Sequence, residues 1–461
     1  MKEKNNEIFS DSEVFKLGSL SSRIEKKGGY FFKEYILEKS NLTENLNQTL
    51  LNFKNDNNDS LEHPESIKIS EYGENLRKVS LKQKELLPFL NKNSITSMHL
   101  YDLGCLILKQ QKYLIDKNLS FCDARPDNYW LNKNNNKLVD IGSIQVLSLQ
   151  NLYSFEEDFI NHFIYPLLIE KSNNIPVSCF FNANIYKYKI NILSNLKIYK
   201  SLSFLKFAIS KNLKDMINIF ISNANTSFVS FLNDFKNENN DFEITKRKGL
   251  KINKYLINLL NTLKPKIKES QWTNYTEFHE QQYNKNKKAI FQKFSEKYLH
   301  KGIVDLGSNL TFLDEKSIEY RIDNDISICN EIYINQQKNN FVSLIDISNA
   351  LLGKSSDYLS MLNPNKKYSS AIMISIIHHL IIGDGINPNL VFFNLSKLYK
   401  YILFEYPLEE DPMVRLLYRK RNEFINWGWE DNHEIEAKKY FAIKEYKKLS
   451  NTRRIFMLET K

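Results

Sequence analysis

Three polar residues in the N-terminal half, Asp123, Asn128 and Asp140, have residue types and a spacing that could support phosphate transfer. Asn128 follows Asp123 by five positions, and Asp140 lies twelve positions further on, directly before Ile141-Gly142. Such a site needs one carboxylate beside the acceptor hydroxyl, and a carboxamide with a second carboxylate to hold Mg²⁺ against the phosphates. The segment is therefore a candidate site for Mg²⁺ and a nucleotide.

This spacing is that of a kinase catalytic loop followed by a metal-binding Asp, but other kinase signals are missing from the sequence. The N-terminal region has no GxGxxG loop, no His-Arg pair precedes Asp123, and Lys33 is only a candidate for the phosphate-binding lysine. The alternative is structural: Asp123 and Asn128 hydrogen-bond the turn around Pro126, while Asp140 caps the next segment. A retained kinase-like fold is favoured over working phosphotransfer.

A second group of polar residues follows predicted strands in the C-terminal part. The strand GIVDL runs into VDLGSNLTFL, where Asp305, Gly307 and Asn309 occupy the positions of a nucleotide-type turn, in which Gly lets the backbone approach a ligand closely. Asp323 ends the next strand, 18 positions after Asp305, where a carboxylate can bind ribose hydroxyls. Asp325 is a nearby alternative for that role.

The third, fourth and fifth predicted strands end in Asp346, in His378-His379 and in Glu405. Because α/β sheets bind ligands at the carboxyl ends of their strands, these residues are expected at one crevice, with Asp346 suited to the base of an adenosyl ligand. Either histidine is a candidate to deprotonate an acceptor hydroxyl or amine, since imidazole titrates near neutral pH. The alternative is that one ring packs in the core and the other bonds the backbone. Neither has metal-ligand spacing with a third partner.

An α/β fold has to position these residues. From Gly302 onward short apolar runs alternate with helical or loop segments, which is typical of a parallel sheet covered on both faces. The seven runs are GIVDL, EYRID, FVSLID, SSAIMISII, YILFEY, KYFAIKEY and RRIFMLE. The last two, joined by a turn around residues 449–452, are predicted to form the antiparallel edge of a mixed sheet.

The N-terminal part is predicted to be α+β. Residues 14–37 contain β-type runs around a Gly28-Gly29 turn, and residues 41–65 are polar enough for a solvated loop. Residues 100–115 and most of 155–265 carry apolar side chains at helical spacing. We therefore predict a kinase-like region at 1–150, a mainly helical extension at 151–268 and an α/β domain at 269–461.

Composition limits the kinds of partner and compartment. Hydrophobic residues make up 42% of the chain, which is typical of a globular protein. The net charge of +10 is spread along the chain, so a nucleic-acid partner is not predicted. The four cysteines form no CxxC pair, and no signal peptide or membrane-spanning run is found, so a reducing cytoplasm is the expected location.

The chain resembles the nodulation NoeA-like class I methyltransferases, which depend on S-adenosylmethionine (SAM) and carry a kinase-like N-terminal region. The resemblance covers most of the length. In the N-terminal half it lies in LLPFL, LILKQQKYLIDKNLSFCDARPDN, LVDIGSI and FINHFIYPLL. In the C-terminal half it lies in WTNY, VDLGSNLTFL, the acid after strand two, SIIHHLIIGDGI, ILFEYPLEEDPMVRLLYRKRNEF and SNTRRIFML.

The resemblance implies a Rossmann-like methyltransferase domain with SAM bound by the first-strand turn and the strand-end acids. The implied cofactor residues are Asp305, Gly307, Asn309, Asp323 and, near the adenine, Asp346. It also implies that His378-His379 faces the acceptor, which would be a cell-surface saccharide or a related small molecule. One position departs from the family pattern: Leu310-Thr311 replaces the glycine that usually closes the first motif, and a side chain there would crowd the methionine part of SAM.

Three functions follow from these observations. The leading one is methyl transfer from SAM to an oxygen or nitrogen nucleophile, with His378 or His379 as the base and no metal ion required. The second is a Mg²⁺-dependent phosphotransferase that uses Asp123, Asn128 and Asp140. The third is a non-catalytic protein of glycan assembly with both sites degenerate, for which Thr311 is the main support. The sequence does not indicate an oligomeric state.

Overall fold

A computed structural model shows the chain as two compact units. The first comprises residues 1–87, 100–175 and 183–264, and the second comprises 88–99, 176–182 and 265–461. The described part of the chain leaves out residues 1–12, 18–21, 39–45, 57–60, 72–73, 75, 85, 87–89, 91, 133–135, 183–241, 268, 271–280, 300–301, 309–317, 336–339, 353–355, 422–426 and 429–431. The division at residue 264 lies close to the proposed boundary at 268, and the proposed regions 1–150 and 151–268 both fall mainly in the first unit.

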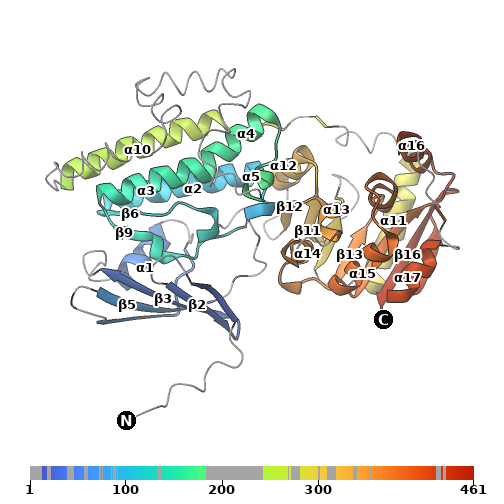
Figure 1. The fold of residues 1–461 in the computed structure, drawn as a ribbon, viewed down its shortest axis with the longest axis horizontal. Coiled ribbons are helices and arrows are strands. Elements are labelled where there is room, and N and C mark those ends of the chain that lie inside the picture. Colours follow the sequence, from blue (N-terminus) through green and yellow to red (C-terminus); the bar gives the residue numbers. More distant parts are fainter. Residues whose placement is uncertain are drawn as a thin grey trace, which may run out of the picture. The chain divides into compact units, whose positions relative to one another are not determined.

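An antiparallel sheet begins the first unit (Figure 1). Its strand order is β1-β2-β3-β5-β4, and the β2–β3 hairpin turns at Gly28 and Gly29, both of which have positive φ. Two successive positive φ values are what a tight hairpin of this hand requires, so the predicted Gly-Gly turn is confirmed. The strands are β1 (Glu13–Leu17), β2 (Ser22–Lys27), β3 (Tyr30–Glu38), β4 (Ser66–Glu71) and β5 (Leu76–Lys84).

The prediction of a continuous loop over residues 41–65 is wrong. Helix α1 (Leu46–Asp56) lies within it, between β3 and β4. The apolar residues Leu46, Leu50 and Phe53 recur at helical spacing, and Leu50 and Phe53 are completely buried. Burial of Leu50 and Phe53 outweighs the weak helix preference of the surrounding Asn and Asp residues.

The rest of the first unit is mainly helical. The pattern predicted over residues 155–265 is confirmed in the described part, and residues 183–241 lie outside it. Ile115, Leu147 and Leu152 form a buried cluster with Leu250 and Ile252 of α10, so α10 packs on this helical layer. The elements are α2 (Ser97–Asp116), β6 (Leu119–Phe121), β7 (Tyr129–Trp130), β8 (Lys137–Leu138), β9 (Ile144–Val146), α3 (Leu149–Phe159), the π-helix η5 (Ile160–Ile164), α4 (Tyr165–Asn173) and α10 (Phe242–Thr262).

A seven-stranded mixed sheet forms the second unit, in the order β12-β11-β10-β13-β14-β16-β15. The first five strands in this order are parallel, and β16 is antiparallel to both β14 and β15. The seven predicted strands and the antiparallel edge are therefore confirmed, and this topology fits a Rossmann-like methyltransferase fold. The strands are β10 (Ile303–Leu306), β11 (Ile318–Asp323), β12 (Phe341–Leu344), β13 (Ser370–Met373), β14 (Tyr401–Pro407), β15 (Phe441–Lys448) and β16 (Arg453–Thr460).

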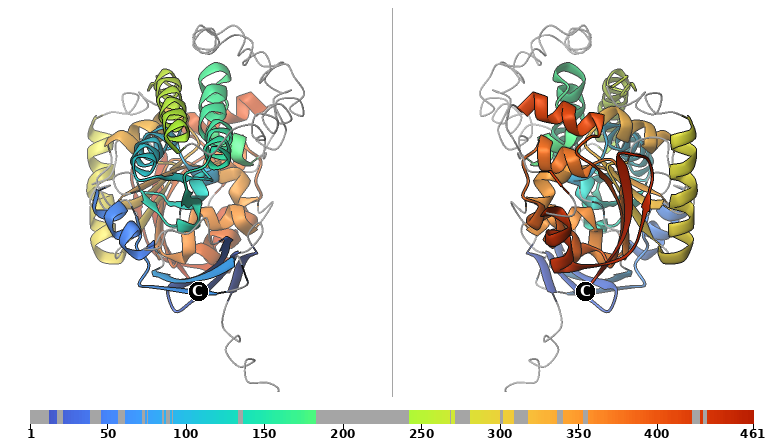
Figure 2. Two further views of the ribbon diagram at one scale, coloured as in Figure 1. Left: turned by 90° about the vertical axis from the view of Figure 1, so that its left-hand side faces the viewer. Right: turned by 90° about the vertical axis from the view of Figure 1, so that its right-hand side faces the viewer.

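Helices cover both faces of this sheet, as Figure 2 shows. Leu403 of β14 packs in a cluster with Phe291 and Phe294 of α11, whereas its neighbour Phe404 meets Phe392 of α15 on the other face. This alternation is the strand period of two, and it explains why the strands are almost wholly apolar. The helices are α11 (Gln281–Tyr298), α12 (Ile326–Asn335), α13 (Ile347–Leu351), α14 (Ser356–Leu362), α15 (Pro388–Leu398), α16 (Pro412–Arg421) and α17 (Glu434–Tyr440).

Two segments from the N-terminal half belong to the second unit. In the segment 88–99, Ser97 and Met98 contact α12: the Asn330 side chain accepts from the Met98 backbone N–H at 3.0 Å and donates to Ser97 Oγ at 2.9 Å. The His99 ring stacks on Tyr333 of the same helix. Residues 176–182, which contain α5 (Val177–Asn182), are the second such segment. The second unit is therefore not made from the C-terminal sequence alone.

We predict that Asn330→Ala destabilises the second unit, because it leaves a buried backbone N–H without its acceptor. The expected loss is about 2 kcal/mol of unfolding free energy, measured by urea denaturation. Asn335→Ala, at an exposed position at the end of the same helix, is the matched control and should change the free energy by less than about 0.5 kcal/mol. Equal effects of the two substitutions would contradict the anchoring of residues 88–99 by Asn330.

Candidate functional site

The strand order of the second unit reverses between β10 and β13. From β10 the chain adds β11 and then β12 on one side, and it continues with β13 and β14 on the other. In open α/β sheets this switch point leaves a crevice at the carboxyl ends of the strands, where ligands bind. Functional side chains are therefore expected at this edge of the sheet, here called the crevice edge.

Gly307 makes the turn directly after β10. Its φ is +77°, and a Cβ at this position would lie 2.6 Å from Ile376 Cδ1, so a side chain is excluded by both backbone conformation and space. The N–H groups of Gly307 and Ser308 both donate to the Ile322 carbonyl at the end of β11, at 2.9 and 3.0 Å. This holds the turn against the second strand. Asn309, Leu310 and Thr311 lie outside the described residues.

Asp305 is buried and faces the interior of the fold. Burial raises the pKa of its carboxyl, while Arg321, a hydrogen bond with Ser308 and Lys287 oppose that rise. Arg321 also donates to Ser308 Oγ at 3.4 Å. Asp305 is thus placed to support the Gly307 turn from inside.

Asp323 lies at the end of β11 and is only partly buried. Its Oδ1 accepts from the Asp325 backbone N–H at 2.9 Å, and no side chain among the described residues is hydrogen-bonded to its carboxylate. Burial raises the pKa of Asp323 to about 7. The alternative acid, Asp325, instead accepts from the N–H groups of Ser327 and Ile328 at the start of α12. The structure thus separates a helix cap, Asp325, from a carboxylate that retains acceptor capacity.

Asp346 is the exposed N-cap of α13. Its carboxylate accepts from both the backbone N–H and the side-chain amide of Asn349, at 3.1 and 2.6 Å. A cap of this kind stabilises the helix start regardless of any ligand.

The two histidines that follow β13 differ in environment. His378 is completely buried, neither ring nitrogen has a hydrogen-bond partner among the described residues, and desolvation lowers its pKa well below the usual value. His379, the first residue of the π-helix η10 (His379–Gly383), is partly exposed. Burial lowers its pKa too, partly offset by the Asp384 carboxylate. His379 is therefore the histidine that an acceptor can reach, and it is neutral near pH 7.

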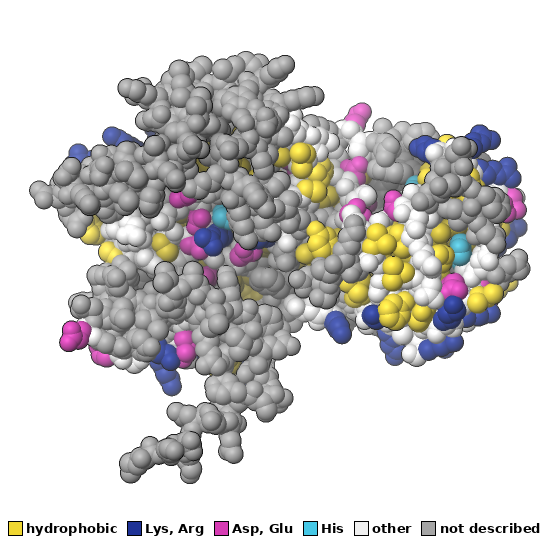
Figure 3. Space-filling model, viewed as in Figure 1, with side chains coloured by type: hydrophobic (Ala, Val, Ile, Leu, Met, Phe, Trp, Pro, Cys, Tyr) yellow, Lys and Arg dark blue, Asp and Glu magenta, His cyan; other side chains and the backbone are white. Residues whose placement is uncertain are grey.

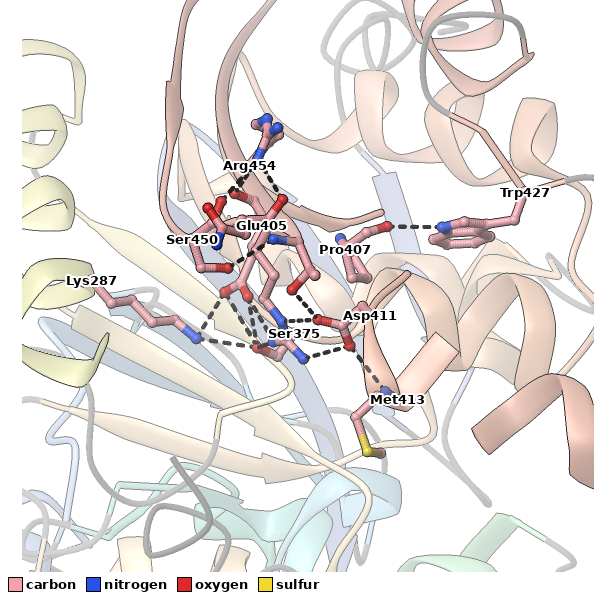
Figure 4. Close-up of polar contacts among 12 residues, drawn as sticks. Lys287, Ser375, Glu405, Pro407, Asp411, Met413, Trp427, Ser450 and Arg454 are labelled. Carbon is pink, nitrogen blue, oxygen red and sulfur yellow. Dashed lines mark hydrogen bonds and ion pairs between the residues drawn. The ribbon is translucent and has the colours of Figure 1, made fainter. Parts of the chain in front are cut away.

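Figure 4 shows a group of buried charges that the sequence did not reveal. The charges of Lys287, Glu405 and Arg453 in this group act on the pKa of His378. Glu405 of β14 binds Lys287 of α11 and Arg453 of β16, each at 2.8 Å, and Arg453 also binds Asp411. Glu405 was expected at the crevice, but its cationic partners were not. The available signal was Arg453 at the start of the predicted strand RRIFMLE, where charged residues precede the apolar run IFML.

In the first unit the structure brings together the residues of the N-terminal constellation. Asn128 donates its side-chain amide to the Asp123 carbonyl at 3.1 Å, and its own carbonyl accepts from the Val139 and Asp140 N–H groups. Lys33 of β3 donates to the Val139 carbonyl at 2.6 Å; burial lowers its pKa, and the charge of Asp140 opposes this.

Asp123 lies in a mixed group of charges, and Figure 3 shows acidic side chains gathered around basic ones on this unit. Asp123 pairs with Arg125 at 3.0 Å, and Arg125 also reaches Asp158 at 3.4 Å. Burial raises the pKa of Asp123 to about 7, although Arg125 opposes the rise. A carboxylate poised in this range can exchange protons near neutral pH.

No group of three or more His, Cys, Asp or Glu residues in the described part of the chain is arranged to hold a metal ion. None of the helices seen there is long and apolar enough to cross a membrane.

The sequence matches no family model and no curated protein. Among solved structures, the PH0226 protein from Pyrococcus horikoshii OT3 is similar over 41% of this chain and 97% of its own, with 16% identity and a TM-score of 0.28. A putative methyltransferase from Thermobifida fusca YX is similar over 39% of this chain and 80% of its own, with 12% identity and a TM-score of 0.29. The bifunctional kinase-methyltransferase WbdD is similar over 42% of this chain and 43% of its own, with 14% identity and a TM-score of 0.28. Likenesses this weak do not identify the family of the chain.

We predict that Gly307→Ala destabilises the second unit, because alanine is strained at this φ and its Cβ overlaps Ile376. The expected loss is about 2 to 4 kcal/mol in urea denaturation. Gly383→Ala is the matched control: its nearest neighbour is 3.9 Å away and its φ is not positive, so a change within about 1 kcal/mol is expected. If Gly307→Ala is as mild as the control, the turn does not have the close packing described.

Proposed function

We propose that the second unit binds SAM and transfers its methyl group to an oxygen or nitrogen nucleophile of a small molecule or saccharide. The observation that carries this proposal is the position of the Gly307 turn and the Asp323 carboxylate on neighbouring strands at the switch point of the seven-stranded sheet. A backbone turn without a side chain and an acid at the next strand end form the pattern that binds a nucleoside in such sheets.

The side chains at this edge fit a nucleoside cofactor. Asp323 can accept hydrogen bonds from ribose hydroxyls. Its carboxylate accepts one backbone N–H, from Asp325, and no hydrogen bond from a side chain among the described residues. Asp346 and Asn309 remain candidate contacts to the adenine and the turn-bound part of SAM. When bound, SAM supplies a methyl group activated by the neighbouring sulfonium charge.

His379 is the proposed base. It is partly exposed beside the crevice edge, and its lowered pKa keeps the imidazole neutral and able to accept a proton near pH 7. His378 is buried behind it and would support the loop. The reaction then needs an aligned acceptor and a proton acceptor, and it needs no metal ion.

We predict that S-adenosylhomocysteine binding depends on an ionised Asp323. Because the pKa of the free carboxyl is raised to about 7, affinity should increase as pH rises through this value and the acceptor form becomes populated. Calorimetric titration at about pH 6 and about pH 8 should show tighter binding at the higher pH.

Asp323→Asn should weaken binding about tenfold at the higher pH and abolish the dependence on pH. The control is Asp325→Asn, which alters a helix cap and should leave the pH dependence in place. Unchanged affinity in Asp323→Asn would rule out the ribose assignment.

A second candidate function, phosphotransfer in the first unit, is favoured by the position of Lys33. The first unit has a five-stranded antiparallel sheet with a helix between β3 and β4, and a lysine on β3 whose amine donates to the Val139 carbonyl, next to Asp140. These features resemble a kinase N-terminal lobe and support this candidate. Asn128 and Asp140 would hold Mg²⁺, and Asp123 would accept the proton of the acceptor. The chain departs from kinases in α1, whose sequence LNQTLLNFKND contains no glutamate to pair with the lysine.

We predict that Lys33→Met lowers the affinity for ATP and Mg²⁺ at least about tenfold in calorimetry, because it removes the cation that contacts the phosphates. Lys78→Met on β5 is the control, since this lysine pairs with Glu34 at a partly exposed position and should not affect binding. No binding of ATP by the unmodified chain would exclude this candidate. Absence of binding to both ATP and S-adenosylhomocysteine would favour a non-catalytic protein.

A further inference from the structure

The cluster of Lys287, Ser375, Glu405, Asp411 and Arg453, here called the clamp, joins five parts of the second unit: α11, the turn after β13, β14, the segment before α16, and β16. Glu405 is completely buried, and both of its cationic partners are almost completely buried. The two cations hold the pKa of Glu405 at about 2, despite the opposing effect of burial, so the carboxylate is charged at any working pH.

The clamp binds the hydroxyl group of Ser375. Lys287 Nζ and Arg453 Nη1 donate to Ser375 Oγ at 3.1 and 3.0 Å, and this Oγ lies 3.2 Å from both carboxylate oxygens of Glu405 (Figure 4). One hydroxyl thus meets three charged side chains that come from three different elements. Its hydrogen-bonding capacity is used within the protein.

Ser375 has a backbone conformation that serine rarely adopts. Its φ is +56°, in the left-handed region, which costs an ordinary residue on the order of 1 to 2 kcal/mol. A strained backbone conformation of this kind persists only where contacts with surrounding residues hold it in place. The three charged partners of the hydroxyl supply that constraint, so the clamp and the turn after β13 depend on one another.

Arg453 is itself fixed by Asp411. The guanidinium donates through Nε to Asp411 Oδ2 at 2.7 Å and through Nη2 to Oδ1 at 3.1 Å, which is a bidentate pair. Asp411 also accepts from the Met413 N–H at the start of α16. Arg453 Nη1, the atom that donates to Ser375 and Glu405, therefore has a defined direction.

The turn that the clamp fixes leads to both halves of the proposed site. The next residue, Ile376, is the side chain against which Gly307 is packed, and the Ile376 carbonyl accepts from the His379 N–H at 2.9 Å. A displacement at Ser375 would move Ile376, and with it the cofactor turn on one side and the candidate base on the other.

We propose that Glu405 is a positioning residue: together with Lys287 and Arg453 it fixes the Ser375 turn, and through Ile376 it places the Gly307 turn and His379. Its role in methyl transfer rests on the proposed function. Stability alone does not explain this cluster, because buried ion pairs often stabilise a fold no more than apolar residues of similar volume. Apolar side chains would not supply several hydrogen bonds of fixed direction to one strained residue, as the clamp does for Ser375.

The first test compares two substitutions of Ser375 in the full chain. Both remove the hydroxyl, but alanine keeps the strain at positive φ whereas glycine relieves it. We expect Ser375→Ala to weaken S-adenosylhomocysteine binding about tenfold, and Ser375→Gly to stay within about threefold of the unmodified chain. Equal and unchanged affinities in both variants would overturn the proposal.

The second test follows the His379 imidazole by NMR in the unliganded chain. The charges near this ring are Asp384, Arg453 and Lys420. Glu405→Gln removes a charge that compensates Arg453, so the His379 pKa should fall and the ring resonances should shift. Leu403→Ala, a buried neighbour on the same strand, is the control for general destabilisation and should leave the His379 titration unchanged.

The two tests separate this inference from the function on which it rests. If the unmodified chain does not bind S-adenosylhomocysteine, the proposed function fails, and the histidine titration alone decides the positioning role. A His379 titration that is the same in Glu405→Gln as in the unmodified chain, or the same in Glu405→Gln and Leu403→Ala, would overturn that role.

Discussion

The buried carboxylate of Glu405 is the constraint on which the second unit depends. A charge removed from water costs several kcal/mol unless partners replace the solvent, and here Lys287, Arg453 and Ser375 do so at the same time. These partners come from α11, β16 and the turn after β13. The requirement to satisfy one carboxylate therefore ties together elements that are far apart in the sequence, next to the crevice edge.

The three acids at the carboxyl ends of the first three strands show how similar sequence positions acquire different roles. Asp305 is buried beside Arg321 and supports the turn, Asp346 is bonded to Asn349 and caps a helix, and Asp323 retains a carboxylate without a side-chain donor among the described residues. Carboxylates at strand ends are thus not equivalent ligands. What distinguishes them is how many of their oxygens the protein has already satisfied.

The sequence predicts the strands of the second unit and their antiparallel edge because buried strands are short, apolar and regularly spaced. It fails for α1, where a stripe containing Leu50 and Phe53 is hidden among Asn and Asp residues. It also cannot rank His378 against His379, since adjacent residues differ only in the burial that tertiary packing imposes. The clamp escapes prediction for the same reason: Lys287 and Glu405 are 118 positions apart, and no local pattern links them.

The division of the chain into units determines how its two candidate sites can be studied. Residues 88–99 belong to the second unit, although β5 before them and most of α2 after them belong to the first. A cut near residue 264 would therefore remove the segment whose backbone and Ser97 side chain satisfy Asn330, and would expose the apolar face of α12. Loss of binding in such a fragment would report the loss of packing and not the location of a site. The two chemistries have to be distinguished by point substitutions in the intact chain, where the folded state is held constant.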